Sequence, residues 1–368
     1  MRLTALFSLL FCLASAGTTM LAQSARNFPP ADTMLRDAKH KEPKSGVQVG
    51  PGNSITIQSG VGTPTTINVL SFGKAGALLA AGKDFGRVVV WDVENRKFLC
   101  AADTGQGIVH AVAISPDGQT LASGGEGDKF SLKLWHLPDC RPLKRYDSFS
   151  GYIHSLAFDP NGELLVVSDN TSTAQVLDVA TGKQLISLKD TYSPVLSPDG
   201  TILLTVNKTE FTLWNTSDWT KQRDLPRTPK YAIPLALNPK TDSFLITSAG
   251  TFQLVRLSTG ELLPNVPAQP LPKFNASAGG FAAFDAAVPD LLFGHSDGQL
   301  WAWDSKTGQT CVSEVLYSES GTLSADGSIL AGAKDNSIFA RGQSPDGVLI
   351  WDAKRLAEKC GLGPTLSR

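Results

Sequence analysis

The feature that most constrains the fold of this chain is a repeat of about forty residues that runs through almost all of it. Aligned on one position of the repeat, residues 91, 135, 177, 214, 255, 303 and 351, the copies are 44, 42, 37, 41, 48 and 48 residues apart. A period of this size indicates small units that bury their apolar faces only against each other. Five copies have Trp at this position, and two have Leu177 or Val255; the tryptophans are Trp91, Trp135, Trp214, Trp303 and Trp351.

Within each copy, short apolar segments alternate with turn motifs, which is typical of an all-β protein. A turn such as Ser115-Pro116-Asp117-Gly118 follows the first segment of several copies. Pro sets the first turn dihedral, Asp bonds its own backbone, and Gly accepts the positive φ that closes a hairpin. Each copy has room for four strands, so the sequence predicts a seven-bladed β-propeller of four-stranded antiparallel blades.

An additional apolar segment precedes the first complete copy. It lies within residues 48–58, and residues 54–58 alternate most clearly. An open array would leave a bare strand edge. We therefore expect this segment to be the fourth strand of the last blade and to close the ring.

The second copy, residues 107–147, has the clearest pattern. It reads VHAVAISPDG at 109–118, TLASGG at 120–125 and LKLW at 132–135. These motifs resemble the WD40-repeat propeller family, and the resemblance covers residues 53–361. It implies a rigid propeller that presents its surface to other proteins. Related propellers with Ser-Pro-Asp-Gly turns, including lactonase-like and Tol-type ones, remain alternatives.

The chain departs from the family pattern in one informative way. The Gly-His pair that normally joins a hydrogen-bonded network with the Trp is missing, and Gly105-Gln106 occupy the matching place in the second copy. We therefore expect the blades to depend on packing and backbone ladders more than on a buried polar network.

The N-terminus has the pattern of a signal peptide. Arg2 precedes an uncharged apolar run at residues 3–16, with small residues for cleavage after Ala16 or Ala22. The run is short for a membrane span, and the large Phe11 before Cys12 argues against a lipid anchor. We expect an exported protein, periplasmic or extracellular, with a signal peptide at 1–22, a disordered arm at 23–52, the propeller at 53–362 and a tail at 363–368.

Four cysteines remain after removal of the signal peptide: Cys100, Cys140, Cys311 and Cys360. An even number in an exported chain permits two disulfides. Pairing of neighbours, 100 with 140 and 311 with 360, is the more plausible scheme. Free buried thiols are the alternative, because the last strands of adjacent blades usually lie too far apart for disulfide geometry.

Composition and motifs exclude several classes of function. Thirty-three basic and 34 acidic residues give a net charge of −1, which does not favour nucleic acid or an anionic membrane as partner. The sequence has no phosphate-binding loop, zinc-protease motif or hydrolase nucleophile motif. We therefore predict no catalytic residue, cofactor or metal.

The candidate binding residues come from one position of the repeat, four residues before the end of each first strand. In five contiguous blades this position is polar, and we expect these side chains to form an arc at the mouth of the channel. The arc either solvates the rim or contacts a partner or ligand. Its members are Glu319, Asn68, His110, His154 and Tyr192.

Further candidates lie in turns and insertions expected on the same face. His295 is placed in the turn before a third strand, where a histidine is usually solvated. Residues 267–280 and 334–347 lengthen their copies, and the second insertion contains Phe339 and Arg341. An exposed aromatic residue beside Arg is typical of a protein interface.

These observations favour a monomeric, non-enzymatic propeller scaffold that binds unidentified proteins through its rim loops and channel mouth. Two alternatives remain open: an enzyme of lactonase or quinoprotein type, and an envelope accessory protein that binds a small ligand at the arc.

Overall fold

The structure is a computed structural model in which residues 45–368 form one compact unit. It describes residues 48–49, 55–58, 66–127, 130–147, 149–264, 267, 269–273, 281–297, 299–312, 320–333, 347–359 and 361–362.

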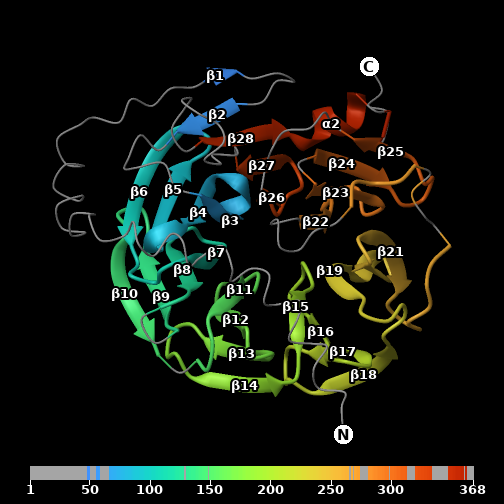
Figure 1. The fold of residues 1–368 in the computed structure, drawn as a ribbon, viewed down its shortest axis with the longest axis horizontal. Coiled ribbons are helices and arrows are strands. Elements are labelled where there is room, and N and C mark those ends of the chain that lie inside the picture. Colours follow the sequence, from blue (N-terminus) through green and yellow to red (C-terminus); the bar gives the residue numbers. More distant parts are fainter. Residues whose placement is uncertain are drawn as a thin grey trace, which may run out of the picture. The chain divides into compact units, whose positions relative to one another are not determined.

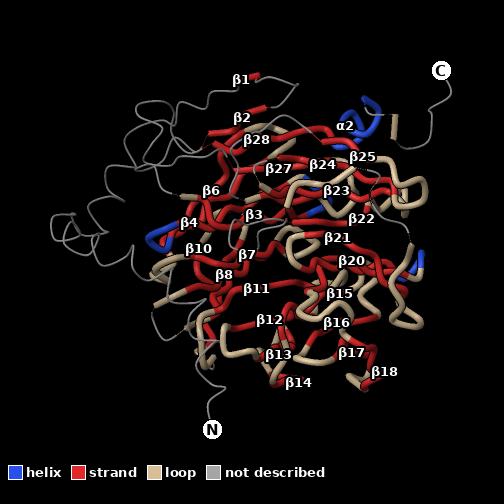
Figure 2. Tube along the Cα trace, turned by 45° about the vertical axis from the view of Figure 1, so that its right-hand side comes forward, coloured by secondary structure: helices blue, strands red, loops and turns tan. Residues whose placement is uncertain are grey.

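The unit is a seven-bladed β-propeller, as the repeat predicts. Seven antiparallel sheets stand around a common axis, with the first strand of each blade nearest the centre (Figure 1). Strands make up nearly all of the regular structure (Figure 2). Blade 1 consists of β3 (Ile67–Gly73), β4 (Leu78–Lys83), β5 (Arg87–Asp92) and β6 (Lys97–Asp103). Blade 2 consists of β7 (Val109–Ile114), β8 (Thr120–Gly125), β9 (Leu132–His136) and β10 (Arg141–Tyr146). Blade 3 consists of β11 (Ile153–Phe158), β12 (Leu164–Asp169), β13 (Thr173–Asp178) and β14 (Gln184–Lys189).

Blades 4 to 6 continue the ring. Blade 4 consists of β15 (Tyr192–Leu196), β16 (Ile202–Val206), β17 (Glu210–Asn215) and β18 (Lys221–Pro226). Blade 5 consists of β19 (Ile233–Asn238), β20 (Ser243–Ser248) and β21 (Thr251–Arg256). Blade 6 consists of β22 (Phe281–Phe284), β23 (Leu291–Ser296), β24 (Gln299–Asp304) and β25 (Thr310–Val312). Short 3-10 turns η3 (Lys74–Gly76), η4 (Asp84–Gly86) and η5 (Pro239–Thr241) connect some of the strands.

Blade 7 combines strands from both ends of the described chain. Its order is β1 (Gln48–Val49), β2 (Ile55–Gln58), β28 (Gly347–Asp352), β27 (Ile329–Ala333) and β26 (Gly321–Leu323). The antiparallel register of β2 and β28 pairs Ile55 with Ile350 and Gln58 with Gly347. Helix α2 (Ala353–Lys359) follows β28, and no helix among the described residues is long and apolar enough to cross a membrane.

Blade 5 differs from the expected four strands. Its sheet contains β19, β20 and β21, and a single bridge from Val255 to Leu262 stands where a fourth strand begins. The sequence after that bridge contains Pro264, Pro267, Pro270 and Pro272. Because proline has no N–H to donate to a ladder, this composition ends the strand pairing.

The first hairpin turns follow the expected chemistry. In blade 2 the Ser115 hydroxyl donates to the Asp117 carboxylate and accepts from the N–H of Thr120. Gly118 closes the turn with a φ of 74°. Serine and aspartate make the same contacts in blades 4 and 7, which explains why this motif recurs at the same place in the repeat.

Each repeat tryptophan packs against the preceding blade. Trp91 joins an apolar cluster with Val348 and Ile350 of blade 7, and Trp135 joins one with Val88 and Val90 of blade 1. Trp214, Trp303 and Trp351 lie in the clusters with blades 3, 5 and 6. The core is therefore a ring of interfaces between sheets, as a repeat array requires.

The expectation that these blades depend on packing and backbone ladders more than on a buried polar network does not hold for blade 2. Gln106 is fully buried, and its amide nitrogen donates to the backbone carbonyls of Ser123 and Ser131. The Ser123 hydroxyl donates to the Gln106 amide oxygen at 2.8 Å and accepts from the Trp135 indole at 2.9 Å. Gln106 thus occupies the place of the family histidine and completes the network with different chemistry.

The networks of the other blades are smaller. Trp214 donates to Thr205, and Trp301 donates to Ser296. The indole nitrogens of Trp91 and Trp303 are buried and have no hydrogen-bond partner. Packing alone therefore holds the repeat tryptophans of blades 1 and 6, in agreement with the sequence-based expectation.

The disulfide that pairs neighbouring cysteines is present in blades 1 and 2. Cys100 in β6 is bonded to Cys140, whose Cα lies 5.7 Å away, immediately before β10. Cys311 is also disulfide-bonded, and its partner lies outside the described residues. The Cys100–Cys140 bond adds a covalent link at the outside of two blades that also share an apolar cluster.

Replacing Gln106 by Ala is expected to destabilise the protein by roughly 1–3 kcal/mol, because buried acceptors lose their donor. Urea unfolding followed by tryptophan fluorescence measures this change. Gln119→Ala makes the same replacement at an exposed position and should change the unfolding free energy little. Equal effects of the two substitutions would contradict a structural role for the network.

Replacing both Cys100 and Cys140 by Ser is expected to cost about 2–4 kcal/mol, because the bond closes a long loop in the unfolded chain. Urea unfolding of the double variant, compared with the unaltered protein in oxidising buffer, measures this cost. A reducing agent should lower the stability of the unaltered protein more than that of the variant. An unchanged midpoint in the variant would show that the bond does not stabilise the propeller.

Candidate functional site

The antiparallel blades give the propeller two faces with different connections. The turns between first and second strands and between third and fourth strands share one end, the turn face. The connections between second and third strands and between blades share the other end, the loop face. On the loop face they include residues 84–86, 104–108, 126–127, 130–131 and 227–232.

Three of the predicted arc residues lie at equivalent irregularities on the loop face. The register of the first strand shifts between Ile67 and Val69 in blade 1, so Asn68 lies in a β-bulge. His110 and His154 lie at the same irregularity in β7 and β11. A bulge redirects a side chain that a regular ladder would alternate between faces. Blades 1, 2 and 3 therefore place these three polar side chains at one repeated position on the first strands.

The residues sixteen positions later in the chain complete two of these sites. Asn68 donates from Nδ2 to the Asp84 carboxylate at 3.0 Å. His110 contacts the Glu126 carboxylate through Nε2, also at 3.0 Å. Asp84 and Glu126 each follow the second strand of their blade. We did not predict these acidic residues, although their common spacing from the bulge is visible in the sequence.

The histidines of blades 2 and 3 are close enough to affect each other. The His110 ring lies 4.9 Å from the Tyr152 ring, and His154 Nε2 lies 3.4 Å from the Ser168 hydroxyl. His154 is an exposed residue, but protein atoms around its ring remove part of the surrounding water. This desolvation lowers the pKa of His154. The positive charge of a protonated His110 would lower it further, while Asp169 opposes the change. His154 is therefore a neutral hydrogen-bonding group near neutral pH.

Tyr192 does not join this group. The bulge in β15 covers Ser193 and Pro194, two residues instead of one, and Tyr192 pairs with Val206. It takes the place that Val109 and Ile153 fill in blades 2 and 3. Its side chain is half-buried and packs against the apolar cluster shared by blades 4 and 5. The extra bulge residue explains why counting back from the strand end assigned it to the arc.

The predicted position of His295 is wrong. It lies within β23 instead of the following turn, and only 1% of it is exposed. Both ring nitrogens lack a hydrogen-bond partner, and the ring stacks with Phe281 at 6.5 Å. Burial lowers the pKa of His295 to about 4. It is a neutral core residue and not part of a solvated rim.

The remaining sequence-based candidates lie outside the described residues. They are Glu319, Phe339 and Arg341. The aspartates that follow the tryptophans bond local turns: Asp92 accepts from Asn95, Asp304 from Lys306 and Thr307, and Asp352 from Arg355.

Three exposed aromatic side chains add a feature of the loop face that we did not predict. Phe85 is 76% exposed, Tyr231 58% and Phe130 37%. All three have left-handed backbones, with φ values of 59°, 66° and 51°. This conformation is unfavourable for a bulky residue. Each lies in a loop next to the first or third strand of its blade, at the same end as the bulge residues.

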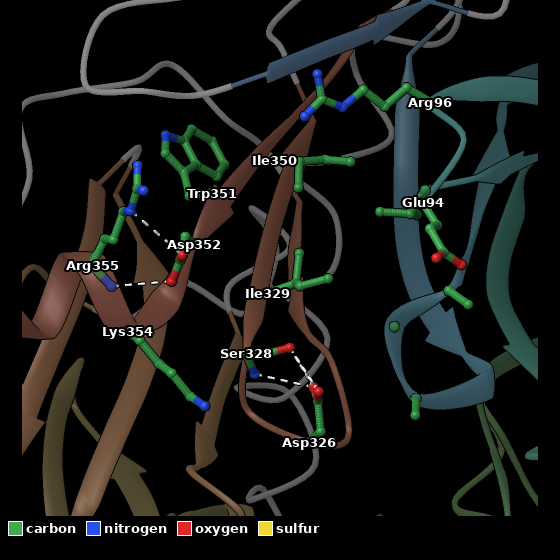
Figure 3. A pocket seen from close by; sticks show the side chains of 14 residues that line it. Glu94, Arg96, Asp326, Ser328, Ile329, Ile350, Trp351, Asp352, Lys354 and Arg355 are labelled. Atoms are coloured by element: carbon green, nitrogen blue, oxygen red, sulfur yellow. Dashed lines mark hydrogen bonds and ion pairs between the residues drawn. The ribbon is translucent and has the colours of Figure 1, made fainter.

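The turn face contains a cleft of about 660 Å³ between blades 7 and 1 (Figure 3). Blade 1 contributes the β3–β4 and β5–β6 turns, including Val93 and Glu94. Blade 7 contributes Asp326, Ile329 and Ile350. Its volume is in the range of small-molecule sites, and it lies at the opposite ends of the strands from the histidines.

The described residues contain no cluster of three or more His, Cys, Asp or Glu able to hold a metal ion. The loop face instead offers hydrogen-bonding groups that differ from blade to blade, an amide in blade 1 and imidazoles in blades 2 and 3, beside exposed aromatic rings. These groups suit recognition of another molecule through several small contacts.

The family model described as "WD domain, G-beta repeat" matches residues 97–136 and 140–176. The chain resembles the WD40-repeat β-propellers. Each matched segment begins at or just before a fourth strand, β6 or β10, and ends in the third strand of the next blade. One WD40 repeat thus contributes strands to two blades. No curated protein matches the chain.

The buried His295 makes the stability of this WD40-like propeller depend on pH. Its folded pKa of about 4 lies below the ordinary 6.5. As pH falls, the unfolded chain takes up this proton first. The stabilisation is therefore fully present above pH 6.5 and is lost as the pH falls to about 4. Since one unit of pKa difference corresponds to about 1.36 kcal/mol, the free energy of unfolding should fall by roughly 3 kcal/mol.

Urea unfolding across this pH range tests the prediction with the variant His295→Leu. The variant should lose less stability than the unaltered protein between pH 6.5 and 4. The substitution Gln119→Leu, at an exposed residue that does not titrate, should leave the pH dependence unchanged. Parallel pH profiles for the unaltered protein and His295→Leu would rule out this source of acid sensitivity.

Proposed function

We propose that this protein is a non-enzymatic binding protein that holds a partner protein on its loop face. The observation that carries the proposal is the set of three exposed aromatic residues, Phe85, Phe130 and Tyr231, on that face. The WD40 propellers that the chain resembles are usually non-enzymatic and commonly bind proteins.

The energetics of these three residues favour a binding role. Each leaves apolar ring surface in water, and each left-handed backbone costs of order 1–3 kcal/mol. Ten other described non-glycine residues share this backbone conformation, so the exposed ring and not the strain distinguishes these three. Aromatic residues dominate the energetics of protein interfaces because they bury large rigid surfaces with little loss of conformational entropy.

The bulge residues supply the polar part of the proposed interface. Asn68 and His110 are each held by a carboxylate, so their side chains are already oriented before a partner arrives. A prepared group loses less entropy on binding than a free one. The proposed interface therefore has aromatic anchors in the loops and oriented polar groups on the first strands.

We also propose that the protein works outside the cytoplasm. The N-terminal apolar run resembles a signal peptide, and the Cys100–Cys140 bond supports the proposal because disulfides persist in oxidising compartments. Fusion of residues 1–22 to a reporter enzyme that is active only after export tests this part. Activity equal to that of a leaderless reporter would contradict it.

Alanine at Phe85, Phe130 and Tyr231, singly and together, is expected to weaken capture of a partner. Each anchor is expected to contribute about 1–2 kcal/mol, which corresponds to roughly five- to thirtyfold in Kd. Immobilised protein is incubated with an extract of the producing cells, the partner is identified by mass spectrometry, and its Kd is then measured with purified material.

The control variants are Leu143→Ala and Leu185→Ala. Both leucines are about as exposed as Phe130, but they lie on the outer strands β10 and β14. They should bind the partner with unchanged affinity. Circular dichroism shows whether each variant is folded. Equal affinity of the folded triple aromatic variant and the unaltered protein would contradict the proposal.

A further inference from the structure

The cleft between blades 7 and 1 results from the small residues of two turns. Elsewhere on the turn face, neighbouring first turns stack closely: Gly162 lies against Pro116, and Gly200 lies against Pro160. At the junction of blades 7 and 1, Ala325 stands where blades 2 to 4 have proline. The facing turn of blade 1 contains only small side chains after Lys74, those of Ala75, Gly76 and Ala77. Gly76 approaches Ser324 and Ile329, and space remains beside this contact.

The two walls of this cleft are apolar with carboxylates at the opening. Ile329 and Ile350 project from blade 7 toward the side on which Glu94 of blade 1 lies, and Val93 also lines the cleft. Glu94 extends from the blade 1 wall, and Asp326 stands on the blade 7 wall, where its carboxylate accepts hydrogen bonds from Ser328 of the same turn (Figure 3). The cleft therefore offers an apolar channel that ends between two acidic groups.

The ionisation of Asp326 is favoured by its own turn. Burial opposes its charge, but hydrogen bonds from Ser324 and Ser328 outweigh that effect and hold its pKa below the ordinary value. Within the described residues, neither Glu94 nor Asp326 has a cation within 4.0 Å. Both carboxylates can therefore pair with a positive group that enters the cleft.

The cations of the cleft lie away from this pair of carboxylates. Arg355 is 3.8 Å from Asp352 and occupies it. Lys354 and Arg355 project from α2 on the far side of β28, and Arg96 lies at one end beside Ile350 (Figure 3). Over the whole lining three acidic and three basic residues balance, and Glu94 and Asp326 are the two carboxylates of the lining without a described cation within 4.0 Å.

We propose that this cleft receives an arginine or lysine side chain presented by a partner protein. The methylene groups of the side chain would pack against Ile329, Ile350 and Val93, and its charged head would lie between Glu94 and Asp326. Long basic side chains combine an apolar stem with a charged tip, which matches this arrangement. Arg96 at the end of the cleft suits an acidic residue next to the basic one. The site is on the turn face and is independent of the function proposed for the loop face.

The test uses small probes that copy the side chain. Butylguanidinium carries the cation, butylurea is its neutral analogue, and pentanoate is an anion of similar length. Methyl NMR spectra of protein labelled at isoleucine Cδ1 report on Ile329 and Ile350 directly. We expect butylguanidinium to shift both methyl signals in a saturable way, and butylurea and pentanoate to bind more weakly.

Matched substitutions assign the binding to the carboxylates. Glu94→Gln is expected to weaken butylguanidinium about three- to fivefold, in line with one exposed ion pair. Glu163→Gln changes the same residue type on the turn face of blade 3 and should leave the affinity unchanged. The proposal is overturned if the cation shifts neither methyl, if butylurea binds equally well, if pentanoate binds more tightly, or if the two substitutions have the same effect.

Discussion

The packing of each sheet against the next is the interaction on which the rest of this structure depends. A single blade exposes two apolar faces and cannot bury either by itself. The repeat tryptophan meets this requirement in a directional way, because each one packs against the blade that precedes it. The stability of any one sheet is therefore inseparable from that of its neighbours, and the ring places strands from both ends of the described chain in blade 7.

The same requirement explains where covalent and polar contacts are found. Blades 1 and 2 are linked on the outside by the Cys100–Cys140 bond, and blade 2 contains the Gln106 network. Blades 1 and 6 hold their repeat tryptophans by packing alone. At the junction of blades 7 and 1 the packing is tight around Trp91, but it leaves a gap at the turn face where alanine and glycine replace larger residues.

Much of this fold is predictable from the sequence because its determinants are local. The Ser-Pro-Asp-Gly turns, the apolar second and third strands, and the periodic tryptophans each have a cause within a few residues, and the structure places them as expected. The number of strands in blade 5 depends on a proline-rich stretch whose effect the period does not reveal. Gln106 could replace the family histidine because only the geometry of its donors and acceptors matters, and residue type alone does not show that geometry.

The candidate site was less predictable, since it depends on register. Asn68 and His110 lie where strand counting puts them, while one additional bulge residue places Tyr192 against the core cluster of blades 4 and 5. His295 was assigned to a turn because Ser296-Asp297-Gly298 resembles one, but β23 extends through Ser296. Asp84 and Glu126 pair with Asn68 and His110, and the repeat predicts this pairing only when the position of the bulge is known. Long-range register, not composition, separates the correct assignments from the wrong ones.

The bulge of the first strand has a consequence for how such a surface can diversify. The residue in the bulge makes no ladder pair, so its side chain can change from amide to imidazole without altering the strands beside it. Blades 1, 2 and 3 thus carry an interchangeable side chain at the same position of the first strand. Point substitutions at these bulge residues could change the binding specificity of the loop face and leave the propeller that supports them intact.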